Sequence, residues 1–169
     1  MEDVDPEKQS RHFELLMGWL SKAGYEHYEI SNFAKPGFRS GHNSSYWQGR
    51  SYLGLGPSAH SFNRASRQWN IANNALYIKS LQQNIVPFEI EHLTETQQIN
   101  EYIMTSLRTM EGISLPFLSK QWNEKLSDDI LHDSQRWIKK NQMKQDEDHL
   151  VLTNEGKLFA DGIAAELFR

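Results

Sequence analysis

One histidine lies in a short motif whose residue types could bind a metal-containing ligand. In His42-Asn43-Ser44-Ser45-Tyr46-Trp47, the histidine follows a serine and a glycine, so we expect it in a loop. A neutral imidazole nitrogen is a good ligand for haem iron. Arg39 and Arg50 flank the motif and could contact the propionates of a porphyrin. The alternative for a single loop histidine is a surface side chain that hydrogen-bonds within a turn.

The motif lies in a stretch without carboxylates. Six of the 18 Lys and Arg residues fall between Glu29 and Glu89, and none of the 22 Asp and Glu residues does. The stretch is therefore +6, whereas the rest of the chain is −10. It also holds five of the ten glycines and many of the aromatic residues. Such a composition is typical of a site for a flat or anionic ligand. The alternative is a strand-and-turn region that lacks carboxylates by chance.

A segment of small residues follows within the same stretch. Its candidate cavity residues are Gly54, Gly56, Ser58, Ala59, His60 and Ser61. Small side chains allow a backbone to approach a ligand closely, although a tight strand bend would use them equally well. The segment lacks the Gly-Lys-Ser/Thr of a phosphate loop and has Ala59 where the dinucleotide-binding fingerprint most often has a third glycine. The remaining histidines lack a nucleophile–base–acid arrangement, so we interpret them as structural or solvated.

The elements that position these residues begin with a helix. Asp5 can cap it, Pro6 suits its first position and Gly24 its end. A β-rich run over residues 25–33 follows at once and predicts a strand. A helix followed by a strand is half of a βαβ crossover, which predicts the tail of a longer α/β repeat. A complete α+β domain that opens with a helix is the alternative.

The middle and the end of the chain predict a different pattern. We expect a strand over residues 67–71, a helix from 76 to 81, and a helix that opens with the capping box at Thr94 and ends at Gly112. Helices over 115–121 and 127–140, a hairpin from 142 to 152 and a closing helix capped by Thr153 are typical of a winged-helix-like module. From Gly112 onwards there are 8 basic and 10 acidic residues, which argues against nucleic-acid binding.

Composition excludes several classes of protein. The 169 residues have no cysteine, so the chain cannot form disulfides, thiolate zinc sites or its own cysteine-ligated cluster. No apolar run approaches the length of a membrane span, and the acidic N-terminus does not look like a signal peptide. We therefore expect a soluble cytoplasmic protein.

Taken together, the motifs resemble one family. Gly24-Tyr25, Tyr28 to Gly37, His42-Asn43-x-x-Tyr46-Trp47, Tyr52 to Phe62 and Leu107-Arg108 occur in an order similar to that of the radical S-adenosylmethionine, oxygen-independent coproporphyrinogen III oxidase-like proteins. The resemblance covers nearly the whole chain. It implies a longer parent with a partial (β/α) barrel whose cysteine motif holds a [4Fe–4S] cluster and S-adenosylmethionine. Because this chain has no cysteine, we expect it to lack that half and to be inactive alone.

Within the family, the His-Asn-x-x-Tyr pattern resembles the haem-chaperone branch, which is thought to bind haem and deliver it to acceptor proteins. The resemblance implies that His42 ligates haem iron, with Asn43 and Tyr46 completing the motif. It also implies that Asn32, Phe33 and Ala34 face the cofactor and substrate cavity, together with the Gly54–Ser61 segment. The alternative is an oxidase that decarboxylates two propionates of coproporphyrinogen III.

The expected architecture is therefore α+β. Residues 1–73 would be the last helix–strand unit of the barrel with its following strands, and 74–169 a mainly helical, winged-helix-like domain. Residues 112–169 could instead serve as a docking module for the acceptor protein. An unpaired strand edge where the barrel should continue predicts a tendency to dimerise.

Overall fold

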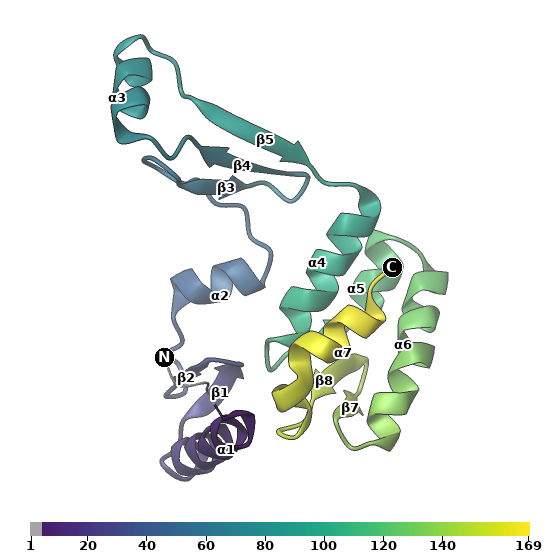
Figure 1. Ribbon diagram of the computed structural model, residues 1–169. Coiled ribbons are helices and arrows are strands. Elements are labelled where there is room, and N and C mark those ends of the chain that lie inside the picture. The colour runs from purple at the N-terminus through teal and green to yellow at the C-terminus, as the bar shows by residue number, and fades with distance from the viewer. Residues whose placement is uncertain (1–4) are drawn as a thin grey trace.

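The N-terminal region of the computed structural model, which describes residues 5–169, is a helix with a small hairpin (Figure 1). Helix α1 (Pro6–Lys22) begins as predicted, since the Asp5 side chain accepts hydrogen bonds from the amides of the first turn. The predicted single strand is instead two antiparallel strands, β1 (Glu26–Glu29) and β2 (Asn32–Ala34). The chain reverses here because the Glu29 carboxylate accepts hydrogen bonds from the Ser31 amide and the Asn32 side chain.

The middle region consists of a short helix and a three-stranded sheet. Helix α2 (Gly41–Trp47) is followed by β3 (His60–Phe62), β4 (Ser66–Asn70), α3 (Asn74–Gln82) and β5 (Phe88–His92). The sheet is antiparallel in the order β3-β4-β5, and α3 lies at its far end (Figure 1). The predictions of β4 and α3 are confirmed, whereas β5 was not predicted.

The placement of His42 in a loop was wrong. His42 is the second residue of α2, and the Ser40 side chain caps this helix by accepting a hydrogen bond from the Asn43 amide at 3.1 Å. Serine and glycine favour both loops and helix N-termini, so the sequence alone could not distinguish the two. The helical conformation determines how the motif residues are arranged, because in a helix His42 and Tyr46 lie one turn apart on the same face.

The C-terminal region begins with the predicted capping box. Thr94 and Gln97 exchange side-chain and backbone hydrogen bonds at the start of α4 (Glu95–Leu107). The helix was predicted to end at Gly112 but ends at Leu107. Gly112 instead has a φ of +72°, and a Cβ there would lie 2.2 Å from the Leu150 carbonyl oxygen. A glycine is therefore required where the chain turns into β6 (Ile113–Ser114).

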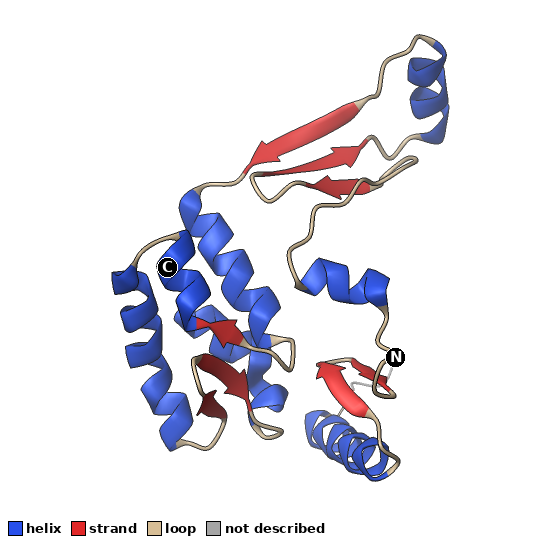
Figure 2. Cartoon of the chain, turned by 180° about the vertical axis from the view of Figure 1, so that it is seen from behind, coloured by secondary structure: helices blue, strands red, loops and turns tan. Residues whose placement is uncertain are grey.

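The remaining elements follow the predicted order of two helices, a hairpin and a helix. They are α5 (Leu115–Gln121), α6 (Glu124–Lys139), β7 (Met143–Asp146), β8 (His149–Leu152), the 3₁₀ helix η1 (Gly156–Phe159) and α7 (Ala160–Leu167). The sheet order is β6-β8-β7, all antiparallel. The helices gather around this sheet (Figure 2). Within residues 5–169 the fold is thus a mixture of seven α-helices and three small antiparallel sheets.

The hydrophobic core lies in the C-terminal region. All of its buried members fall between Ile99 and Leu167, and they come from α4 to α7 and from the third sheet. Leu150, Ile103, Ile130 and Ile163 are completely inaccessible to solvent. No helix in the described residues has the length and apolarity that crossing a membrane would require.

Candidate functional site

The two faces of α2 have different surroundings. His42 and Tyr46 lie on its exposed side with their rings edge to face, 5.0 Å between centres. Asn43 and Trp47 point inwards, and the Asn43 side chain accepts a hydrogen bond from the Trp47 indole nitrogen at 3.2 Å. Asn43 also donates to the Tyr28 hydroxyl at 3.5 Å. The motif thus presents the imidazole outwards and anchors the helix by its other two residues.

A row of aromatic rings runs from His42 towards the middle sheet. The Tyr46 ring lies 4.7 Å from that of Tyr52, which in turn lies 5.9 Å from Phe62. Tyr52 and Phe62 also exchange backbone hydrogen bonds at 2.9 and 3.0 Å, so the loop residue is fixed to β3. Desolvation and the neighbouring Tyr46 raise the pKa of Tyr52 above that of an exposed tyrosine.

Tyr52 and Phe62 form part of the wall of an open groove. Its volume of about 410 Å³ falls within the usual range for small-molecule sites. The remaining lining residues are mostly polar: Ser51, Leu53, Ser61, Asn63, Ser66 and Gln68. The groove therefore offers aromatic faces and hydroxyl and amide groups close to the row of rings that begins at His42.

The Gly54–Ser61 segment forms the loop beside this groove. Gly54 lies so close to β3 that a Cβ there would be 2.2 Å from the His60 carbonyl oxygen, and its amide donates to Ser61 Oγ at 3.0 Å. Asn70 donates a hydrogen bond from its side chain to the Gly56 carbonyl at 2.9 Å. Ser58 has a φ of 59°, in the left-handed region of the backbone, which a glycine adopts more readily than a serine. His60 is exposed, 6.2 Å from the Trp69 ring.

The structure does not bring Asn32, Phe33 and Ala34 to the groove. Asn32 donates to Glu29, Phe33 stacks on His27 with 4.0 Å between ring centres, and Ala34 is buried. None of the three is among the residues that line the groove in the described part of the chain. A role for them in a cavity remains a prediction.

The two arginines suggested as propionate contacts differ in their surroundings. Arg39 forms ion pairs with Glu26 at 3.0 Å and with Glu111 at 2.7 Å, so its charge is already balanced. Arg50 is exposed directly after α2. The position of Arg50 therefore suits an anionic group better than that of Arg39.

Sequence reasoning missed a polar cluster behind α2. The Glu29 side chain is fully buried and pairs with Arg108, which comes from the end of α4, at 3.0 Å. The guanidinium carbon of Arg108 also lies 4.8 Å from the centre of the Trp47 ring. Leu107-Arg108 belonged to the motifs that carried the family resemblance, which was the one signal that could have marked this residue.

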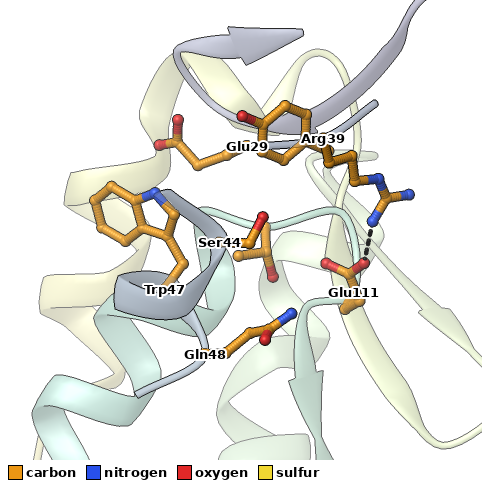
Figure 3. Close-up of a pocket in the computed structure, with 8 residues that line it drawn as sticks. Glu29, Arg39, Ser44, Trp47, Gln48 and Glu111 are labelled. Carbon is orange, nitrogen blue, oxygen red and sulfur yellow. Dashed lines mark hydrogen bonds and ion pairs between the residues drawn. The ribbon is translucent and has the colours of Figure 1, made fainter. Parts of the chain in front are cut away.

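A small pocket opens beside this cluster (Figure 3). Glu29, Arg39, Ser44, Trp47, Gln48 and Glu111 surround it together with Tyr28 and Thr109. Its volume of about 20 Å³ has room for about one water molecule. The pocket is therefore part of the junction between α2 and the C-terminal region and is too small for a porphyrin.

The comparisons with known proteins agree on one family. Residues 93–159 match the family described as HemN C-terminal domain. The heme chaperone HemW of Bacillus subtilis is 28% identical over 93% of this chain, and that of Mycobacterium tuberculosis is 30% identical over 96%. These stretches are 42% and 40% of the two relatives, so the chain spans about two fifths of their length.

The solved structure of coproporphyrinogen III oxidase (HemN) from Escherichia coli is similar over 98% of this chain and 42% of its own, with a TM-score of 0.71. At 17% sequence identity this likeness concerns the fold. The family assignment rests on the sequence matches. Residues 93–159 belong to the HemN C-terminal domain family, and the chain as a whole is homologous to the C-terminal part of the HemW heme chaperones.

Proposed function

We propose that this chain is the haem-binding C-terminal part of a haem chaperone, with His42 as the ligand of the haem iron. The observation that carries the proposal is the exposed His42–Tyr46 pair on α2, which continues through Tyr52 to the open groove that Tyr52 and Phe62 help to line. The names of the HemW relatives, which describe them as heme chaperones, support the same function.

The chemistry of haem fits this arrangement. Haem needs an axial ligand, flat apolar contacts for the macrocycle and cations for two propionates. An exposed imidazole on a short helix supplies the first, and the rings of Tyr46 and Tyr52 supply the second. Arg50 lies just beyond the helix as a propionate partner, and the surrounding stretch has no carboxylate between Glu29 and Glu89.

The iron–sulfur chemistry of the family does not fit this chain. None of its 169 residues is a cysteine, so it has no thiolates for a [4Fe–4S] cluster. In our proposal the cluster and S-adenosylmethionine belong to the partial barrel of a longer protein, to which α1 and β1 contribute the last unit. The boundary expected between residues 73 and 74 would separate β5 from β4, with which it pairs, so the helical, winged-helix-like domain would begin at α4. Residues 112–169 would meet the acceptor protein.

Haemin titration of the purified chain tests the proposal. We expect saturable binding at about one haem per chain, with a shifted Soret band that His42→Ala removes. His12→Ala is the matched control, because His12 is an exposed histidine on α1. Titration with iron-free coproporphyrin separates iron ligation from binding of the macrocycle alone.

Unchanged haemin affinity and an unchanged spectrum in His42→Ala would contradict the assignment of the ligand. Equal binding of coproporphyrin, insensitive to His42, would favour the oxidase alternative. In that case the groove would hold the porphyrin without contributing an iron ligand.

A further inference from the structure

Helix α2 is held in place by few contacts. It has seven residues, and none of them is buried. Hydrophobic packing therefore contributes little to its position, although the proposed function requires the imidazole of His42 at a defined place. The inward-facing contacts of Asn43 and Trp47 must therefore supply most of the interactions that position the helix.

Arg108 makes the contact that connects this helix to the C-terminal region. Its guanidinium carbon lies 4.8 Å from the centre of the Trp47 ring, within the range of a cation–π interaction. The same side chain hydrogen-bonds Glu29 through Nε at 3.0 Å and Asp161 of α7 at 3.3 Å. One planar guanidinium can stack on a ring and donate along its edge at the same time, which a lysine cannot.

The orientation of Arg108 is itself fixed. Glu29 is fully buried, and its second oxygen accepts hydrogen bonds from the Ser31 amide and the Asn32 side chain. The backbone of Arg108 takes part as well, since its carbonyl accepts the Ile30 amide hydrogen bond at 2.9 Å. A buried carboxylate with all these donors leaves the guanidinium little freedom.

We propose that Arg108 is a positioning residue for His42. It stacks on Trp47, Trp47 donates to Asn43, and the two inward residues set the height and rotation of α2, which presents His42 and Tyr46. This inference rests on the proposed function, because the residue positioned is the haem ligand. Arg108 acts without touching the haem, by raising the fraction of molecules in which α2 is docked and able to bind.

The chain offers a matched control for this stack. The guanidinium carbon of Arg136 lies 4.8 Å from the centre of the Trp137 ring, the same distance as in the Arg108–Trp47 pair. Arg136 also pairs with Glu166 at 2.6 Å. Arg136 and Trp137 lie on α6 and Glu166 lies on α7, so all three are in the C-terminal region. Arg136→Gln therefore removes an arginine–tryptophan contact without touching α2, while Lys140 still lies over the Trp137 ring. The conservative variant Arg108→Lys keeps the charge next to Glu29 and removes the planar stack.

The test combines a measurement without haem and one with haemin. The indole Nε1–H resonance of Trp47, assigned with Trp47→Phe, reports the hydrogen bond to Asn43. We expect Arg108→Gln to shift this resonance, to leave that of Trp137 in place, and to weaken haemin binding about tenfold. Arg108→Lys should fall between this variant and the wild type. Arg136→Gln should shift the Trp137 resonance and leave haemin affinity within about twofold.

Two results would overturn the proposal. If Arg108→Gln leaves the Trp47 resonance unchanged, Arg108 does not position α2. If haemin binding weakens while that resonance stays in place, Arg108 contacts the haem directly. If the wild-type chain binds no haemin, the proposed function fails by itself, and the Trp47 resonance still decides whether Arg108 fixes the helix.

Discussion

The C-terminal region and the N-terminal half of the described chain are held together by different forces. Between Ile99 and Leu167 the buried apolar side chains form one continuous core. In residues 5–92 only Met17, Tyr28 and Ala34 are buried apolar residues. Hydrophobic burial therefore stabilises the first region, whereas ion pairs, ring contacts and backbone hydrogen bonds hold the second. The candidate haem ligand lies in the region with the weaker core, where local motion costs least.

The exposed surface shows the same contrast. Trp19, Leu53 and Leu55 are 64%, 75% and 83% exposed, and α3 has no buried residue. The contacts that fix the N-terminal hairpin are instead directional, such as the hydrogen bond from the Met110 amide to the Tyr28 carbonyl at 3.1 Å.

The largest expected effect compares two leucines. Leu150 is completely buried and Leu55 is 83% exposed. Leu150→Ala should lower the free energy of unfolding by about 2–5 kcal/mol, because it leaves a cavity in the core. Leu55→Ala should change it by less than about 0.5 kcal/mol. Urea unfolding measures both, and equal losses would remove the distinction between the two regions.

A second pair of variants compares two glycines of the N-terminal half. A Cβ at Gly54 would lie 2.2 Å from the His60 carbonyl oxygen, whereas one at Gly18 of α1 would meet no atom within 4 Å. Gly54→Ala should cost about 1–3 kcal/mol locally, since the loop must move away from β3. Gly18→Ala should stabilise α1 by about 0.5–1 kcal/mol.

Hydrogen exchange of the amides in the loop and in α1 reads these two effects separately. Unchanged protection of Tyr52 and Phe62 in Gly54→Ala would show that the close approach of the loop to β3 contributes nothing to the groove.

The capping box at Thr94 gives a smaller effect in the C-terminal region. Its side chain accepts a hydrogen bond from the Gln97 amide at 3.2 Å. Thr94→Ala should lower the free energy of unfolding by about 1 kcal/mol, whereas Thr94→Ser should keep most of the stabilisation that the cap provides. Thermal unfolding of both variants checks this, and an equal loss in the serine variant would argue against the cap.

The smallest effect is a pH dependence at the boundary between the two regions. Burial lowers the pKa of His27, and the charge of Lys157 lowers it further, while the hydrogen bond to the Ile30 carbonyl and the charge of Glu29 oppose the shift. The unfolded chain then binds more protons than the folded one, so stability falls as pH drops below about 6.5. In the neutral form, Nδ1 accepts from Lys157 at 3.1 Å.

His27→Gln should flatten this dependence. We expect its melting temperature to change less between pH 7 and pH 5 than that of the wild type. His132→Gln is the control, because His132 is exposed on α6 and should leave the profile unchanged. A wild-type melting temperature that rises between pH 7 and pH 5 would contradict the expected sign of this dependence.

Much of the fold could be predicted from local signals. Asp5, Thr94 and the Asp146–His149 turn are side-chain or turn features, and the helices and hairpin they predict are present. The reversal after Glu29 was missed because it depends on a buried side chain that only tertiary structure fixes. The pairing of Glu29 with Arg108 spans 79 residues and has no local signature.

The candidate site, like the fold, was predicted from the sequence only in part. His42 and Tyr46 were predicted together through the family resemblance, and the structure places their rings edge to face. Asn32, Phe33 and Ala34 were grouped with them through the resemblance; in the hairpin, Asn32 contacts Glu29, Phe33 stacks on His27 and Ala34 is buried. The His-Asn-x-x-Tyr pattern could be recognised in the sequence, whereas its helical conformation and the direction of a short strand could not.

The most direct test of the central claim is rescue of the ligand that His42 would supply. We predict that the haemin complex of His42→Gly loses the spectrum of an imidazole-ligated haem. Added imidazole should restore that spectrum, because His42 is exposed and its removal leaves the iron accessible. A His42→Gly complex that keeps the wild-type spectrum without imidazole would contradict the account.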